Sequence, residues 1–91
     1  MSHTTASKKQ IIARVRRIAG QVNGIERALE NEAECEKVLH LVAGARGAMN
    51  GLMDEILADF VREHVAAPKL SAETRRTGAD NLIAIIRRYA K

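Results

Sequence analysis

The chain has 91 residues, a formal net charge of +4, one cysteine and only two aromatic residues. A chain of this length forms one domain with a modest core, and a single cysteine excludes an internal disulfide that would brace it. Oligomerisation is the usual remedy, because neighbouring copies then complete each other's core. Residues 1–10 are polar and basic and no apolar run is long enough to span a membrane, so we expect a cytoplasmic protein with a free thiol.

Charge is unevenly distributed along the chain. Residues 1–25 contain no acidic residue, whereas four glutamates crowd residues 30–36. Such asymmetry indicates a basic face for a polyanion and a separate acidic rim. An ordinary solvated helix surface is the alternative interpretation. The basic residues of the first stretch are Lys8, Lys9, Arg14, Arg16 and Arg17.

The first predicted helix spans residues 7–30 and follows a short arm, residues 1–6. Its apolar residues recur in alternating steps of four and three, which is the spacing of a seam that packs along another helix. Asn31 is a candidate N-cap for the next helix, with Glu34 three residues on as in a capping box. The seam residues are Ile11, Val15, Ile18, Val22, Ile25 and Leu29.

Two further helices are expected, over residues 32–65 and 72–90. The apolar stripe of the longer helix is so broad that it must be covered on more than one side. Pro68 interrupts the helical pattern, and Ser71 is suited to cap the last helix. The sequence thus predicts an all-α fold of three helices. The first two should form an antiparallel hairpin, and two hairpins would make a four-helix bundle.

The candidates for metal or electrophile chemistry are Cys35, His64, His3 and Glu63, which precedes His64. Cys35 lies at the start of the second predicted helix, where the helix dipole favours a thiolate. Cys35 and His64 are twenty-nine residues apart, about 43 Å along a helix, so they cannot meet within one chain. Two chains packed antiparallel would bring Cys35 of one beside His3, His64 and the N-terminus of the other.

Each of these residues also has a plain interpretation. A lone cysteine near a helix start is often inert. A histidine near a helix C-terminus complements the dipole, and a histidine in a polar arm is commonly exposed surface. His40 points to another helix face than Cys35 and is interpreted as structural or surface. The constellation alone leaves both interpretations open.

Two stretches carry a family resemblance: RVRRIAGQVNGIERALENEAEC (14–35) and GARGAMNGLMDEIL (44–57). They resemble the copper-, nickel/cobalt- and formaldehyde-responsive repressors known as CsoR, RcnR and FrmR, most closely the FrmR and RcnR branch. The similarity covers nearly the whole chain and is specific at R-x-x-G-Q, at Cys35 and at R-G-A-x-N-G-L-M. It implies a three-helix protomer, an antiparallel four-helix-bundle dimer and a tetramer formed as a dimer of dimers. Effector binding would release the tetramer from operator DNA.

The resemblance also implies how a metal ion would be bound. Copper-responsive members have a second cysteine where this chain has His64, which disfavours Cu(I). Nickel/cobalt members use the N-terminal amine, His3, the thiolate of Cys35, and histidines at the places of Phe60 and His64. Phe60 departs from that pattern and would weaken an octahedral Co(II) site. Amine, thiolate and imidazole remain for Ni(II), Co(II) or Zn(II), with Glu63 as a further candidate ligand. Such a metal would act as effector, and no resident cofactor is expected.

Formaldehyde-responsive members need less: a cysteine thiolate and a nearby N-terminal amine, bridged by one methylene carbon. Cys35 supplies the thiol, and removal of Met1 would expose the amine of Ser2. Many such members carry a proline where Ser2 stands. Three effector classes therefore stay open: formaldehyde, a divalent metal ion, and another thiol-reactive electrophile.

No helix-turn-helix, zinc-finger or ribbon motif is present, so the basic residues of the first helix are the candidates for contacting operator DNA. Binding of this kind depends on phosphates and groove shape and weakens steeply with salt. An effector that tethers the first helix of one chain to the second helix of its partner would move the basic patches out of register. The resemblance implies contacts from Arg14, Arg17 and Arg46, and Lys8, Lys9 and Arg16 extend the charge.

A second class of function is a metal-binding helical carrier or storage bundle. It predicts no sequence-dependent binding to the DNA upstream of the protein's own gene, which distinguishes it from a repressor. An enzyme is not expected, because the sequence offers no nucleophile–base pair, phosphate loop or paired carboxylates.

Overall fold

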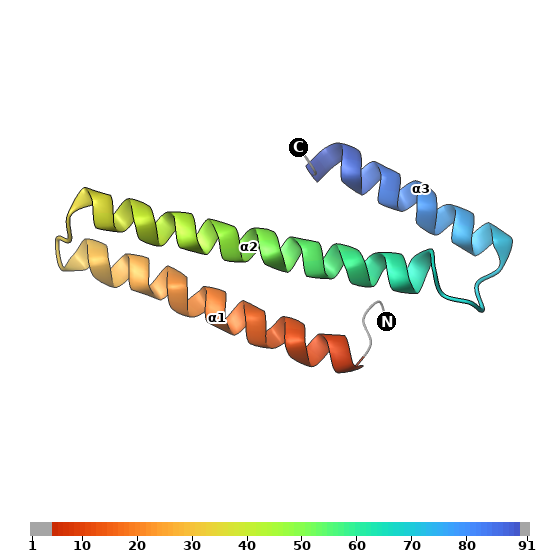
Figure 1. Ribbon diagram of the computed structural model, residues 1–91, viewed down its shortest axis with the longest axis horizontal. Helices are drawn as coiled ribbons and strands as arrows, with labels where there is room; N and C mark the ends of the chain where they lie inside the picture. Colours follow the sequence, from red (N-terminus) through yellow and green to blue (C-terminus); the bar gives the residue numbers. More distant parts are fainter. Residues whose placement is uncertain (1–4, 90–91) are drawn as a thin grey trace.

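The computed structural model describes residues 5–89, which form three α-helices and no strand. The helices are α1 (Thr5–Glu30), α2 (Cys35–His64) and α3 (Ala72–Tyr89). α1 and α2 lie side by side and antiparallel, and α3 folds back along the C-terminal half of α2, away from α1 (Figure 1). The predicted all-α class with a helical hairpin is therefore confirmed.

α1 ends in a Schellman motif, which sets the sharp turn of the hairpin. The N–H of Ala33 donates to the carbonyl of Ala28 at 2.9 Å, and the N–H of Glu32 donates to the carbonyl of Leu29 at 3.1 Å. Glu32 has a φ of 55°, the left-handed conformation that this motif requires. The turn thus uses a glutamate where a glycine is the common choice.

α2 consequently begins at Cys35 and not at residue 32. The predicted capping box of Asn31 and Glu34 is wrong, because Asn31 closes α1: its N–H donates to the carbonyl of Arg27 at 2.9 Å. Glu34 is the N-cap residue, and its side chain makes no capping hydrogen bond. The other bounds differ less. α1 begins two residues before the predicted position, which shortens the expected arm, and α2 ends one residue earlier.

The connection between α2 and α3 is held by a single arginine and capped by a serine. The guanidinium of Arg75 donates to the carbonyl oxygens of Val65, of Ala67 at 3.0 Å and of Leu70 at 3.3 Å. Ser71 Oγ accepts a hydrogen bond from the N–H three residues later at 3.0 Å, which confirms the predicted cap. Carbonyls that the loop would leave unpaired thus find a donor.

α3 crosses the end of α2 at Gly78, which is buried. A Cβ at this position would overlap the carbonyl oxygen of His64 and lie 2.8 Å from its carbonyl carbon. Contacts this short do not occur with a real side chain, so the crossing requires glycine. Gly78 therefore fixes how closely α3 approaches the residue that ends α2.

Only half of the α1 seam is used within the chain. Ile18 is buried, and Ile11 and Ile25, seven residues to either side, are half-buried against α2. The alternate seam positions face away from the hairpin, and α2 repeats the pattern. These exposed positions are Val15, Val22 and Leu29 of α1, with Val42 and Met49 of α2, each 44–60% exposed. A second set of helices is needed to cover them.

The molecule is long and thin, with extents of 56 × 28 × 13 Å. Its radius of gyration is 17.4 Å, against about 12 Å for a compact domain of this length. Its accessible surface is 7193 Å², whereas a folded monomer of this mass exposes about 5200 Å². Among residues 7–89, the buried apolar side chains are Ile18 and Ala28 alone. A single chain does not complete a hydrophobic core.

Candidate functional site

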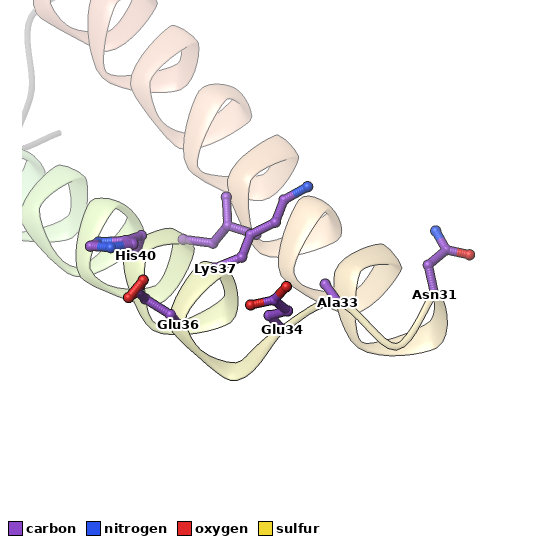
Figure 2. A pocket seen from close by; sticks show the side chains of 7 residues that line it. Asn31, Ala33, Glu34, Glu36, Lys37 and His40 are labelled. Atoms are coloured by element: carbon purple, nitrogen blue, oxygen red, sulfur yellow. The ribbon is translucent and has the colours of Figure 1, made fainter.

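Cys35 is the first residue of α2, and its thiol is free and exposed. An open hollow of about 610 Å³ lies outside the α1–α2 turn, and the two neighbours of Cys35, Glu34 and Glu36, both line it (Figure 2). An accessible thiol beside such a hollow can meet a small electrophile, a metal ion or a segment of another chain. The other lining residues are Asn31, Ala33, Lys37, His40 and Leu41.

His40 was assigned a structural or surface role from the sequence, and the structure places it on the wall of this hollow. Lys37 lies beside it in Figure 2. The signal for this grouping was present, because Glu36 and His40 are four residues apart and so share one face of a helix. Sequence reasoning compared His40 only with Cys35 and missed it.

His64 ends α2, at the opposite tip from Cys35 (Figure 1). Its half-buried ring lies 4.6 Å from the ring of Phe60, at an interplanar angle of 40°. The helix between Cys35 and His64 holds them about 43 Å apart. Within residues 5–89, no three histidine, cysteine or acidic side chains gather closely enough to bind a metal ion. A site that uses both residues needs two chains.

The start of α1 is fixed to this same end of α2 by a buried carboxylate. Asp59 is 4% exposed, and its Oδ1 accepts hydrogen bonds from Ser7 Oγ at 3.2 Å and from Arg62 at 3.0 Å. Sequence reasoning missed Asp59, although an acidic residue between Leu57 and Phe60 in a broad apolar stripe was a signal. The contact places the first turn of α1 near His64.

Two of the predicted site residues, Ser2 and His3, lie outside the residues that the structure describes. A third, Glu63, is the next-to-last residue of α2. Glu63 is half-buried, and its Oε2 is enclosed with no hydrogen-bond partner among residues 5–89. A carboxylate oxygen of this kind is available to a ligand or a partner chain.

Arg14 and Arg17 line a second hollow, of about 260 Å³, between α1 and α2, together with Gln10, Ala13 and Glu55. Arg14 lies 3.9 Å from the carboxylate of Glu55 and crosses α2 at Gly51, where a Cβ would be 2.9 Å from the guanidinium. Both side chains of the pair are about two-fifths exposed, so the ion pair adds little stability. Two guanidinium groups beside an open hollow suit a phosphate.

The remaining basic residues do not join this hollow within one chain. Lys8 is nine residues from Arg17, which places it on the opposite side of α1. Arg46 is five residues from Gly51, about 140° around α2, and so faces away from Arg14. Lys8, Lys9, Arg16 and Arg46 are all exposed. Among the described helices, none combines the length and apolar character that a bilayer crossing needs.

The described residues thus form a small, all-helical protein with an open apolar seam, a hollow lined by two arginines and a free thiol at the turn of its hairpin. The chain belongs to the metal-sensitive transcriptional repressor family, whose model matches residues 7–88. The transcriptional repressor RcnR of Salmonella paratyphi B is 35% identical over 91 residues, the full length of both chains. A Serratia marcescens protein, described as an uncharacterized protein in the bioA 5′ region, is 46% identical over 91 residues, also the full length of both.

A solved structure has the same fold. It is a variant of the formaldehyde-responsive regulator FrmR from Salmonella enterica serovar Typhimurium. It is 37% identical, has a TM-score of 0.87 and aligns over 96% of this chain and 98% of its own. The resemblance expected from the sequence is thus confirmed. The family consists of transcriptional repressors and not enzymes, and its members respond to a metal ion or a small effector molecule.

Proposed function

We propose that this protein is a homotetrameric repressor that binds operator DNA in the cytoplasm and leaves it when formaldehyde links two of its subunits. The link would join the thiol of Cys35 to the N-terminal amine of a partner chain. That amine belongs to Ser2 once Met1 has been removed. The observation that carries the proposal is the position of Cys35. Its exposed thiol lies at one tip of α2. The first turn of α1 lies near the other tip, through Ser7 and Asp59.

The proposed chemistry needs no oxidant and no further reactant. The thiol or the amine adds to the carbonyl carbon of formaldehyde and gives a hydroxymethyl group. The second nucleophile then replaces the hydroxyl group, which leaves as water together with the proton of that nucleophile. One methylene carbon remains between sulfur and nitrogen. The hollow beside Cys35 gives a partner's N-terminus room to approach.

A divalent metal ion is the second candidate effector, and two observations favour it. His64 ends α2 with its imidazole half-buried, and Oε2 of Glu63 is enclosed with no partner within residues 5–89. Thiolate from Cys35 with imidazoles from His64 and His3 suits Ni(II), Zn(II) or Co(II). Phe60 occupies a position where an imidazole would add a ligand, which favours formaldehyde. The name of the RcnR relative and the family description support a metal.

Operator binding would rest on the hollow that Arg14 and Arg17 line. A tetramer would present one such hollow on each subunit. Basic residues of the other chains, including Arg46, would add positive charge to the DNA-binding surface. Tethering α1 of one chain to α2 of another changes the spacing of these groups along the duplex. A coupling free energy of about 1–3 kcal/mol would lower DNA affinity by roughly 5- to 150-fold.

Release from DNA tests the proposal directly. Fluorescence anisotropy with a labelled duplex from upstream of the protein's own gene would be followed during titration with formaldehyde, Ni(II), Co(II) and Zn(II). We expect formaldehyde to release the wild-type chain and to leave Cys35→Ala bound. His64→Ala should keep most of the response to formaldehyde and lose any response to metal. A full response from Cys35→Ala would refute the sensing site, and equal affinity for an unrelated duplex would favour a carrier bundle.

Mass spectrometry of the treated protein provides an independent readout. The expected product is a cross-linked pair of peptides, one containing Cys35 and one the N-terminus, heavier by a single carbon atom. The link should join two different chains, which mixing of isotopically labelled and unlabelled protein would reveal.

A further inference from the structure

The hollow of about 260 Å³ between α1 and α2 combines basic side chains with a carboxylate. Among the described residues that line it, Arg14 and Arg17 are basic and Glu55 is acidic. Residues 1–25 contain no acidic residue, so the negative charge beside the basic part of α1 comes from α2. A carboxylate repels a phosphate. Glu55 therefore opposes the DNA contact that the proposed function assigns to this hollow.

The register of the helical hairpin holds Arg14 close to α2. The guanidinium lies over Gly51, where a Cβ would be 2.9 Å from Nη1. Seven residues along each helix the pattern repeats more loosely, since a Cβ at Gly44 would be 3.9 Å from Nε2 of Gln21. Glycine inside a helix is unfavourable, and a close approach of another group offsets that cost. Gly51 thus allows Arg14 to reach the surface of α2.

Glu55 meets Arg14 at this point. It lies four residues after Gly51 and so shares its face of α2. Its Oε2 is 3.9 Å from Nη2 of Arg14, and both side chains are about two-fifths exposed. The distance is too long for a hydrogen bond, so charge alone holds the pair. A phosphate binds a guanidinium through paired, charge-assisted hydrogen bonds. The carboxylate is therefore near enough to compete with a phosphate and held weakly enough to be displaced by one.

We propose that Glu55 is an internal competitor for the DNA phosphate: it pairs with Arg14 in the free protein, and operator binding displaces it. This inference rests on the proposed function, because it requires that Arg14 contacts DNA. The chain then binds its operator less tightly than its arginines alone would allow. Moderate affinity suits a repressor, since an effector with a coupling of ordinary size can then release the DNA.

Glu55→Gln in the full-length chain is the main test, because it removes the charge at nearly constant size. Fluorescence anisotropy with the labelled upstream duplex, at low salt, would give the dissociation constant. We expect it to fall about threefold for each subunit that contacts the duplex, or roughly tenfold for two, as the strength of an exposed ion pair implies. Structural damage to the hollow would raise the dissociation constant. The direction of the change thus distinguishes competition from structural support.

Two controls make the test specific. Asp54→Asn removes the same charge from the preceding residue, which is exposed and lies about 100° around α2. It should change the dissociation constant by less than about twofold, because water and salt screen its charge. Arg14→Ala removes the group for which carboxylate and phosphate compete. Glu55→Gln should therefore bring almost no gain in the Arg14→Ala background.

The outcomes separate the inference from the function on which it rests. If wild type binds the duplex and Glu55→Gln binds it equally well or more weakly, the inference is wrong. An equal gain from Asp54→Asn, or a full gain from Glu55→Gln in the Arg14→Ala background, would also overturn it, because either result indicates a general effect of net charge. If neither wild type nor Glu55→Gln prefers the upstream duplex to an unrelated one, the proposed function fails, and the inference with it.

Discussion

At the scale of single residues, the turn of the hairpin depends on a glutamate in an unfavourable conformation. Glu32 has a φ of 55° and is the one non-glycine residue with positive φ within residues 5–89. A left-handed conformation costs an L-residue about 1–2 kcal/mol, and glycine avoids that cost at some expense in the entropy of the unfolded chain. We expect Glu32→Gly to raise the free energy of unfolding by about 0.5–1 kcal/mol.

Urea denaturation followed by circular dichroism measures this change. Glu26→Gly is the matched control, because Glu26 is exposed within α1. The control should lower the free energy of unfolding by about 1 kcal/mol, the ordinary cost of glycine in a helix. Equal destabilisation by both substitutions would contradict the strain at Glu32.

The cap residues show what sequence reasoning can reach at this scale. Ser71 was identified correctly, because its hydroxyl bonds the backbone N–H of Thr74 three residues away. Asn31 was misassigned, because asparagine suits the end of one helix and the start of the next. Local sequence does not reveal that Glu32 takes the left-handed position, since glutamate has no preference for it. The tertiary packing of the hairpin imposes that conformation.

At the scale of elements, the crossing of α3 over α2 depends on Gly78. An added Cβ would overlap the carbonyl group of His64, so Gly78→Ala must push the two helices apart. We expect this substitution to destabilise the fold by about 2–3 kcal/mol, as overpacking of a close contact does. Gly47→Ala is the control, because nothing lies within 4 Å of a Cβ there. It should be neutral or stabilising by up to about 1 kcal/mol.

Thermal denaturation of both alanine variants would measure the difference. If Gly78→Ala were as stable as Gly47→Ala, the close approach of α3 to His64 would be refuted.

Helix number, order and approximate length followed from the apolar periodicity, because 3.6-residue spacing is a local property. Which half of the seam packs within the hairpin did not follow from it. Ile18 and Val22 have the same character and belong to the same seam, yet one is buried and the other 51% exposed. The apolar stripe around Asp59 marked it as unusual, but its hydrogen bond with Ser7 was beyond reach, since the two residues are fifty-two apart. Long-range hydrogen bonds leave no local pattern.

At the scale of the whole molecule, the exposed half of the seam predicts a second copy. Val22→Asp places a charge where a partner's apolar side chains would pack. The loss is about 1.5–3 kcal/mol of burial per copy, and the uncompensated charge adds to it. We expect the dissociation constant of the assembly to rise at least about a hundredfold. Sedimentation velocity across a range of concentrations would measure it.

Asn23→Asp is the matched control, because Asn23 is an exposed polar neighbour that gains the same charge. It should sediment like wild type. A Val22→Asp variant with unchanged association would mean that this seam is not the interface.

The sequence predicted where the individual residues of the candidate site lie along α2, but it did not predict the surfaces around them. The large distance between Cys35 and His64 could be predicted from the sequence alone, because each residue of a helix adds a fixed rise along its axis. Their positions at opposite ends of α2 agree with that prediction. The hollow beside Cys35 and the fixed start of α1 emerged only from the fold. The joining of two chains at Cys35 stays a prediction, which the cross-linking experiment addresses.

The contact between Gly78 and the carbonyl of His64 has an optical consequence. With no gap between them, the last turn of α2 and the middle of α3 must shift together. Tyr89 lies eleven residues beyond Gly78, about 16 Å further along the axis of α3, so any rotation of α3 at Gly78 moves Tyr89 as well. The chain contains one tyrosine and no tryptophan. Its intrinsic ultraviolet fluorescence therefore comes mainly from Tyr89 and should report movements of the end of α2 at His64.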